Sequence, residues 1–414
     1  MDVFEQWESE IRGYCRSYPT VFDSASNATM VDRQGRSYID FFAGAGVLNF
    51  GHNNPQMKAA IIRYIERDGI THTLDMASTA KEEFLQAFAD TILKPRNMHY
   101  KMQFMGPTGT NAVEAALKLA RRVTGRTNIA AFTQGFHGMT LGSLACTANK
   151  VFRNAAGVPL NNVTHAHYEG ADTRASLAAL RADFENPSSG IDPPAAFLVE
   201  TIQAEGGVRI ASAEWLKGVQ DLARDLGALF IIDDIQVGCG RTGSYFSFDG
   251  MGLEPDIVTL AKGIGGFGTP MAMNLVKPEH DARWLPGEHT GTFRGQNLSF
   301  VAGREGLRYF DNDELNSRTR ARESRVGEFL AKVAAGKGFS SRGKGLIHGL
   351  DVGDGALSKA IARECFDNGL IVGPCGVSGG VLKLIPPLTI GEAELAQGLE
   401  IFSAAVNVSL EAAA

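Results

Sequence analysis

The chain of 414 residues is poor in cysteine and has no long apolar run. Its 5 cysteines are widely separated and none belongs to a CxxC pair. This spacing argues against a disulfide framework and against a thiolate metal site, so no metal is expected. The most apolar stretch, IVTLAKGIGGFGTPMAMNLV, contains a lysine and several glycines. A membrane span is therefore not expected either.

Charge of one sign is not in excess. The 40 basic and 46 acidic side chains are mixed along the chain and leave a net charge of -6, so a nucleic-acid partner is not expected. The first residues, MDVFEQWESEIRGY, are acidic and amphipathic, whereas a secretory signal needs a basic end followed by an apolar run. We therefore expect a cytoplasmic protein.

Helical patterns alternate with short apolar runs from about residue 50 onward. TNAVEAALKLARRV comes before NIAAF, and EWLKGVQDLARDLG comes before ALFIIDD. Gly227 is expected to end the second of these helices. The runs AAFLVE and DIVTLA have the same β-branched, apolar character. Such alternation predicts an α/β fold with a mainly parallel sheet covered by helices.

The pattern changes after about residue 300. Long helical stretches are followed by the short strands KGLIHGLDV and GGVLKLIPPLTI, which predict a small α+β domain. Before residue 50, TMVDRQGRSYIDF has the pattern of a hairpin that joins it. We predict that residues 1–50 and 301–414 form the small domain and that residues 51–300 form the large one.

An acidic pair, Asp233 and Asp234, ends the predicted strand in FIIDDIQVGCGRTG. Ligands of open α/β sheets bind beyond such carboxyl ends. A carboxylate here is often only a turn former. In an enzyme that uses pyridoxal phosphate (PLP), however, it would keep the pyridine nitrogen protonated. We choose Asp233 for that role, and Gln236 as a donor to the phenolic oxygen of the cofactor.

A lysine, Lys262, follows an apolar run and precedes a glycine-rich loop in VTLAKGIGGFGTP. Most lysines are simply solvated. Burial beside a cationic cofactor would lower the pKa of this amine, which could then attack an aldehyde and later move a proton. Lys262 is therefore a candidate catalytic residue.

Two further motifs could hold a phosphate and an aromatic ring. In FMGPTGTNAVEAALKLARR, Thr108 or Thr110 caps a helix, whose first N–H groups, at Gly109 and Thr110, would suit a phosphate. In FTQGFHGMTLG, Phe136 is either core or a ring that stacks on the cofactor, with His137 in support.

Taken together, these motifs resemble the class III, fold-type I PLP-dependent aminotransferases, which include ornithine, acetylornithine and 4-aminobutyrate aminotransferases. YIDFFAGAGVLNFGHNNP, GPTGTNAVEAALKLAR, GFHGMTLG, VETIQAEGG, IIDDIQVGCGRTG, TLAKGIGG, HTGTFRGQN and KLIPPL occur in the family's order. The resemblance implies a large domain with a mainly parallel seven-stranded sheet, flanked by helices, and a small α+β domain built from both termini.

The resemblance also implies roles for single residues. Lys262 matches the lysine that forms a Schiff base with PLP, Asp233 the partner of the pyridine nitrogen, and Gln236 the neighbour of the phenolic oxygen. Thr292, in HTGTFRG, matches a threonine that reaches the phosphate of the other subunit's cofactor. A homodimer with shared active sites follows, alone or within a higher oligomer.

The substrate end of the site is implied by other matches. In ETIQAEGG, Glu200 matches an active-site glutamate, and Glu205 matches one that can pair with a carboxylate-binding cation. The small residues Gly44, Ala45 and Gly46 would leave room beside the cofactor; a tight turn that needs positive φ explains them equally well.

Two departures concern the dicarboxylate substrate. Lys383 and Met139 stand where ornithine aminotransferases have arginines, and lysine does not reproduce the bidentate geometry of arginine. The substrate carboxylate must then be held differently, by Lys383, Arg294 or Arg241.

The residues that differ resemble a subgroup, the 2,4-diaminobutyrate:2-oxoglutarate aminotransferases of ectoine biosynthesis, in segments such as ERDGITHTLDMA, PGEHTGTFRGQN and LKLIPPLTI. The resemblance implies ping-pong transfer from L-glutamate, the amino donor, to L-aspartate 4-semialdehyde, the oxo acceptor. TLAKGIGGFGTPMA departs from the subgroup and leaves the pathway open. The alternatives are a 4-aminobutyrate or acetylornithine type of aminotransferase and a PLP-fold regulator without activity.

Overall fold

A seven-stranded sheet forms the centre of the computed structural model, which describes residues 3–413. Strand β12 is antiparallel to both of its neighbours, and the other paired strands are parallel. The sheet order is β4 (Lys101–Phe104), β12 (Met273–Val276), β11 (Ile257–Leu260), β10 (Leu229–Asp233), β7 (Ala196–Val199), β5 (Ile129–Phe132) and β6 (Val163–Ala166). This confirms the predicted α/β fold with seven, mainly parallel strands.

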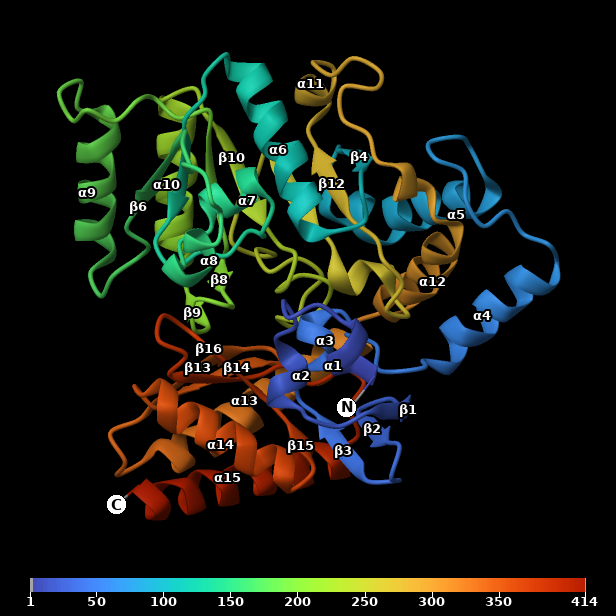
Figure 1. Ribbon diagram of the computed structural model, residues 1–414. Helices are drawn as coiled ribbons and strands as arrows, with labels where there is room; N and C mark the ends of the chain where they lie inside the picture. The colour runs from blue at the N-terminus through green and yellow to red at the C-terminus, as the bar shows by residue number, and fades with distance from the viewer. Residues whose placement is uncertain (1–2, 414) are drawn as a thin grey trace.

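Helices cover this sheet because its central strands are apolar on both faces. Figure 1 shows α6 (Gly109–Thr124), α9 (Thr173–Glu185) and α10 (Ala213–Asp225) around it. Ser212 caps α10 by accepting a hydrogen bond from the backbone N–H of Trp215. The chain leaves that helix at Gly227, whose φ of +62° is the left-handed value expected of a helix stop.

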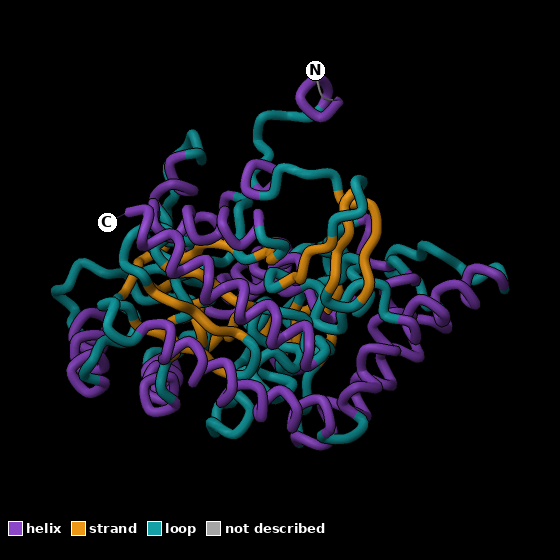
Figure 2. Tube along the Cα trace, turned by 90° about the horizontal axis from the view of Figure 1, so that it is seen from below, coloured by secondary structure: helices purple, strands orange, loops and turns teal. Residues whose placement is uncertain are grey.

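Three helices form a layer beside the sheet edge at β4. Helix α12 (Asn297–Leu307) packs on both α4 (Pro55–Glu66) and α5 (Thr79–Phe88). The short helices are α1 (Val3–Trp7), α2 (Tyr14–Ser17), α3 (Ala43–Gly46), η1 (Ala89–Leu93), η2 (Lys94–Arg96), α7 (Leu141–Cys146), α8 (Lys150–Asn154), η3 (Lys262–Gly265), α11 (Pro278–Asp281), η4 (Thr292–Gly295) and η5 (Arg308–Phe310). Figure 2 shows the first helix standing away from the body of the molecule.

Two smaller sheets lie on the other side of the molecule (Figure 1). One is antiparallel and has the order β13 (Ser340–Lys344), β14 (Ile347–Asp351), β17 (Val381–Leu384) and β16 (Gly373–Cys375). The other has the order β1 (Phe22–Ser26), β2 (Thr29–Asp32), β3 (Ser37–Asp40) and β15 (Leu370–Ile371). Helices α13 (Glu314–Ala334), α14 (Gly355–Asp367) and α15 (Glu392–Ala413) complete this part.

The hairpin predicted from TMVDRQGRSYIDF is confirmed, since β2 and β3 pair in antiparallel fashion. Its second strand also pairs in parallel with β15, which joins the two ends of the chain in one sheet. The domain boundaries at residues 50 and 300 stay predictions. Among residues 3–413, no helix is long and apolar enough to cross a membrane.

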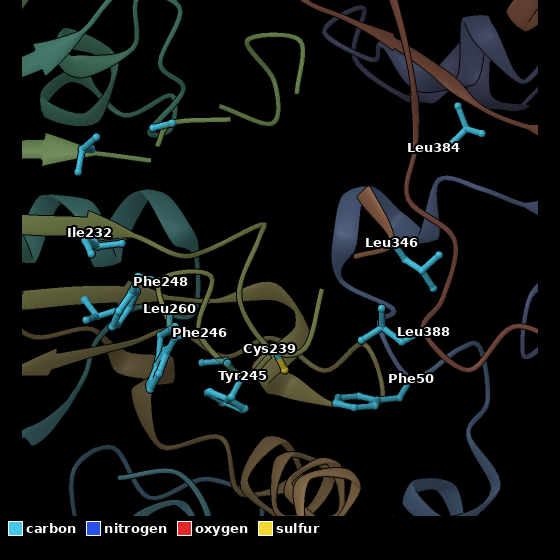
Figure 3. Close-up of a cluster of buried hydrophobic side chains, with 14 of the residues drawn as sticks. Phe50, Ile232, Cys239, Tyr245, Phe246, Phe248, Leu260, Leu346, Leu384 and Leu388 are labelled. Atoms are coloured by element: carbon cyan, nitrogen blue, oxygen red, sulfur yellow. The ribbon is translucent and has the colours of Figure 1, made fainter. Parts of the chain in front are cut away.

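One apolar core connects the large and small parts of the molecule. Figure 3 shows Ile232 and Leu260 of the large sheet on one side and, on the other, Leu384 of β17 and Leu346 in the turn before β14, with Tyr245 between them. The two-residue strands β8 (Ile202–Gln203) and β9 (Arg209–Ile210) also lie between these parts (Figure 1). The carboxyl ends of β7, β10 and β11 meet beside this hairpin.

Candidate active site

A cavity of about 160 Å³ lies at the carboxyl ends of β7, β10 and β11. Most of the predicted site residues meet there, although they come from widely separated segments. The lining residues are Gly109, Thr110, Phe136, His137, Gly138, Glu200, Ile202, Glu205, Asp233, Ile235, Gln236, Val237 and Lys262.

Asp233 ends β10 and points its carboxylate at the ring of His137. The ring Nδ1 lies 2.7 Å from Oδ2, and Oδ1 accepts a hydrogen bond from the Ile235 N–H at 3.2 Å. Burial opposes a charge on His137, but its hydrogen bond and attraction to Asp233 outweigh burial and raise the pKa of the imidazole. The pair therefore places a carboxylate at the cavity wall, hydrogen-bonded to a histidine whose pKa it raises.

The second carboxylate of the acidic pair does not line the cavity. Asp234 accepts the Ser247 N–H, and burial raises its pKa to about 7. A Cβ on Gly238 would lie only 2.4 Å from its Oδ2, so the turn that follows leaves this carboxylate no room to move. Asp233 is thus the one of the two that is placed for chemistry.

Lys262 follows β11 directly and has a φ of +53°. Burial lowers the pKa of its amine to about 8, and the charge of Glu205 partly opposes that shift. A lysine with such a pKa has a substantial neutral fraction near neutral pH, which is the nucleophilic form.

Helix α6 starts at the cavity. Thr108 caps it by accepting the Asn111 N–H at 3.3 Å, which settles the choice between Thr108 and Thr110 as the cap. Gly109 and Thr110 are the first two residues of the helix and line the cavity. Their N–H groups have no intrahelical acceptor, and with the positive end of the helix dipole they form a site suited to a phosphate.

Phe136 and Glu200 form another wall. The backbone N–H of Phe136 donates to Glu200 Oε2 at 3.1 Å. Burial raises the pKa of Glu200 to about 8, so this carboxyl is mostly protonated at neutral pH. The ring of Phe136 packs edge-on against that of Phe152, with 5.7 Å between centroids.

Lys383, Glu205 and Gln236 form a closed hydrogen-bonded ring. Lys383 Nζ donates to Glu205 and, at 3.1 Å, to Gln236 Oε1. Gln236 Nε2 donates to Glu205 at 3.1 Å and to the carbonyl of Ala45 at 2.8 Å. Burial disfavours both charges, but their attraction outweighs it, so the pKa of Glu205 is lowered and that of Lys383 is raised.

Ala45 lies in a strained turn. Residues 43–46 all have positive φ, between +48° and +89°, so the tight turn considered from the sequence is present. The carboxylate of Asp40 accepts the N–H groups of Phe42 and Ala43, each at 2.8 Å, and pairs with His52.

Lys383 and Ala45 contact the lining residue Gln236 but do not themselves line the cavity, and three other residues considered as ligands lie elsewhere. Thr292 accepts a hydrogen bond from His72 Nε2 at its carbonyl, and Arg294 pairs with Asp75. Arg241 is fully buried and donates to the carbonyl of Leu346 at 2.9 Å. Because its guanidinium joins chain segments in the core, Arg241 is not available to a substrate.

Sequence reasoning missed the apolar lining residues Ile202, Ile235 and Val237, and also Gly138. Ile235 and Val237 flank Gln236 in the sequence, so their position beside a predicted site residue could have identified them. Gly138 had no signal beyond its residue type; its φ is +124° and a Cβ there would meet Thr110 Oγ1 at 2.4 Å.

Comparison with known proteins agrees with this geometry. Residues 13–406 match the family Aminotransferase class-III. A diaminobutyrate–2-oxoglutarate transaminase of Bordetella parapertussis is 49% identical over 99% of this chain and 96% of its own. One of Nocardia farcinica is 50% identical over 98% and 94%.

Solved structures give the same result. The ornithine aminotransferase of Toxoplasma gondii has a TM-score of 0.86 and 25% identity, over 99% of this chain and 94% of that one. The family resemblance read from the motifs is thereby confirmed: this chain belongs to the class-III aminotransferases.

Proposed function

We propose that the chain is a PLP-dependent aminotransferase that moves the amino group of L-glutamate to L-aspartate 4-semialdehyde, giving 2-oxoglutarate and L-2,4-diaminobutyrate. The observation that carries this substrate assignment is the end-to-end similarity, at 49–50% identity, to two diaminobutyrate–2-oxoglutarate transaminases. An amino donor and an oxo acceptor, both small molecules, follow from membership of the family.

The residues of the cavity fit PLP. The class-III family uses this cofactor, and a structure of the Toxoplasma ornithine aminotransferase has PLP at partial occupancy in its active site. Here, the Lys262 amine with its lowered pKa suits an aldehyde, and the buried Asp233 carboxyl group suits a pyridine nitrogen. The start of α6 suits a phosphate.

PLP supplies an aldehyde carbon and a ring that withdraws electrons. Lys262 would hold that carbon through its amine, and as a free amine it is the base that would take a proton from the amine-bearing carbon of the substrate. Asp233, held by His137, would face the ring nitrogen and favour its protonated form. An aminotransferase of this kind would use the same residues for the amino donor and for the oxo acceptor, in a ping-pong reaction.

The remaining lining residues orient the cofactor. Gly109 and Thr110 would bind the phosphate through their N–H groups, and Phe136 would lie against the ring. Gln236 would donate to the phenolic oxygen after giving up one of its present hydrogen bonds, while Glu200 closes the wall beside Phe136.

Glu205 lines the cavity and pairs with Lys383, which lies behind it. We assign the polar end of the substrate to this pair. The short side chain of Ala45, beside Gln236, leaves room for it. Arg294 lies outside the cavity and would reach a substrate only across a subunit interface.

A homodimer with shared active sites belongs to the same proposal. Leu74, Met76 and Phe293 are 42%, 62% and 63% exposed, and Phe293 packs on His72, which binds the carbonyl of Thr292. A second copy would cover this apolar face and bring its Thr292 to the phosphate. The free cysteines support a cytoplasmic location.

Turnover with three aldehydes tests the substrate assignment. L-glutamate should support much faster turnover with aspartate 4-semialdehyde than with succinic semialdehyde or N-acetylglutamate 5-semialdehyde. Equal or reversed preference would favour a 4-aminobutyrate or acetylornithine type instead. The wild type should be yellow, and Lys262→Ala should bind PLP without a borohydride-reducible adduct. A colourless wild type would overturn the assignment of the cofactor.

A further inference from the structure

Gln236 has no hydrogen left to donate in this structure. Its amide nitrogen carries two hydrogens, and these are directed to the carbonyl of Ala45 and to Glu205 Oε1. Its amide oxygen accepts from Lys383. Because an ammonium group only donates, the oxygen of the amide must face Lys383, and the orientation of the amide is therefore fixed.

The backbones around Gln236 are held in place. Ala45 belongs to the left-handed turn at residues 43–46, which Asp40 holds. The carbonyl of Glu205 accepts the Gly376 N–H at 2.9 Å. Lys383 lies on β17, between β14 and β16. A rearrangement of the ring is therefore expected in the side chains of Glu205, Gln236 and Lys383.

One bond of the amide must break if Gln236 is to donate to a cofactor. The bond to Ala45 is the shorter of the two, and it ends on a constrained backbone. The bond to Glu205 is longer, and Glu205 retains Lys383 as its partner when that bond is lost. The hydrogen that Gln236 gives to Glu205 is thus the one that becomes available.

We infer that Lys383 is a positioning residue for PLP, acting through Gln236. By anchoring the amide oxygen, Lys383 prevents the amide from turning over and presenting an acceptor to the phenolic oxygen. The same side chain pairs with Glu205 at the substrate end. Lys383 therefore links the binding of the substrate, at Glu205, to the binding of PLP, through Gln236. This inference rests on the proposed function, since it requires PLP at Lys262.

The test measures the dissociation constant of PLP from the full chain without substrate. Lys383→Met removes the anchor and should raise this constant about fivefold, the loss expected for one hydrogen bond. Lys383→Arg keeps a donor and should restore it to within about twofold of the wild type. Lys344→Met, on the edge strand β13 of the same sheet, is the matched control and should leave it unchanged.

A double-mutant cycle shows whether the effect passes through Gln236. Gln236→Leu alone should weaken PLP binding, and adding Lys383→Met should weaken it no further. Additive effects would overturn the inference, as would an unchanged constant in Lys383→Met. Should Lys383→Met not fold, Lys383→Leu provides the same comparison, because leucine also has no donor. A wild type that binds no PLP would overturn the proposed function as well, whereas the other outcomes concern Lys383 alone.

Discussion

The carboxylate of Asp233 and the imidazole of His137 are in hydrogen-bond contact, with 2.7 Å between Oδ2 and Nδ1. The two residues are 96 positions apart in the chain, and neither side chain is more than 5% exposed. Their pairing gives a buried carboxylate a hydrogen-bond partner and fixes the loop after β5 against the end of β10. Removing one member of such a buried pair leaves the other without its partner.

Replacing that partner should impair catalysis more than folding. His137→Leu leaves the Asp233 carboxylate without its charged neighbour, so we expect kcat/KM to fall about 100-fold. Steady-state kinetics with glutamate, together with thermal unfolding, would show this. His165→Leu, at a half-buried histidine on β6, is the control and should leave kcat/KM near the wild-type value. Equal losses in the two variants would contradict the assigned role.

The pKa of Lys262 should be visible in the rate at which the apoprotein takes up PLP. Only the neutral amine attacks an aldehyde. With a pKa of about 8, the rate should rise about tenfold per pH unit below pH 8 and level off above it. Stopped-flow absorbance after mixing with PLP measures this rate. A rate that still climbs near 10.5, the ordinary lysine value, would contradict the lowered pKa.

Glu200 should make the apoprotein less stable as the pH rises. Its pKa of about 8 in the folded chain lies above the ordinary value of 4.5, so the folded chain keeps a proton that the unfolded chain releases. The free energy of unfolding therefore falls between these two pH values. Glu200→Gln has no ionisable group at this position, so its free energy of unfolding should not fall in this way. Between the two pH values the variant should become more stable than the wild type, by at most about 1.4 kcal/mol for each unit by which the pKa of Glu200 is raised.

Urea unfolding of both apoproteins at pH 5 and pH 9 would measure the difference. The variant should be close to the wild type at the lower pH and more stable at the higher one. A constant difference at the two pH values would show that Glu200 carries no raised pKa.

Two glycines, one beside each end of α6, provide a matched pair of substitutions. Gly138→Ala places a Cβ 2.4 Å from Thr110 Oγ1 and should displace the start of the helix, raising the dissociation constant of PLP at least about tenfold. Gly125→Ala, at the other end, also has positive φ but meets no atom within 4 Å. It should cost about 1 kcal/mol of stability and leave PLP binding unchanged. Equal effects on PLP binding would argue against a phosphate site at α6.

The proposed dimer face can be tested by adding charge. Phe293→Asp should disrupt the dimer and weaken PLP binding, because Thr292 of the second copy would be lost from the phosphate site. Sedimentation velocity and absorbance would follow both effects. Val408→Asp, on α15, changes another exposed apolar side chain, 48% exposed against 63% for Phe293, and should remain dimeric. A Phe293→Asp protein that stays dimeric would refute this choice of face.

Local sequence patterns predicted the fold and most of the residues that line the cavity. Asp233 was found because apolar strands end where ligands bind, and Lys262 because a glycine loop followed such a strand. The Lys383–Glu205 pair joins residues 178 positions apart, and no local pattern could have shown that Lys383 also reaches Gln236. Arg241 was considered a ligand because its charge is visible in the sequence, whereas its complete burial is not.

The parallel pairing of β3 with β15 has a consequence for the synthesis of the chain. In this pairing, Ile39 of the N-terminal hairpin lies opposite Leu370, which is near the other end of the sequence. A ribosome that adds about 5–20 residues per second would take roughly 15–70 s to produce the missing strand. During that interval the hairpin has an open edge, so the nascent protein depends on chaperones or on rapid completion to avoid pairing with another chain.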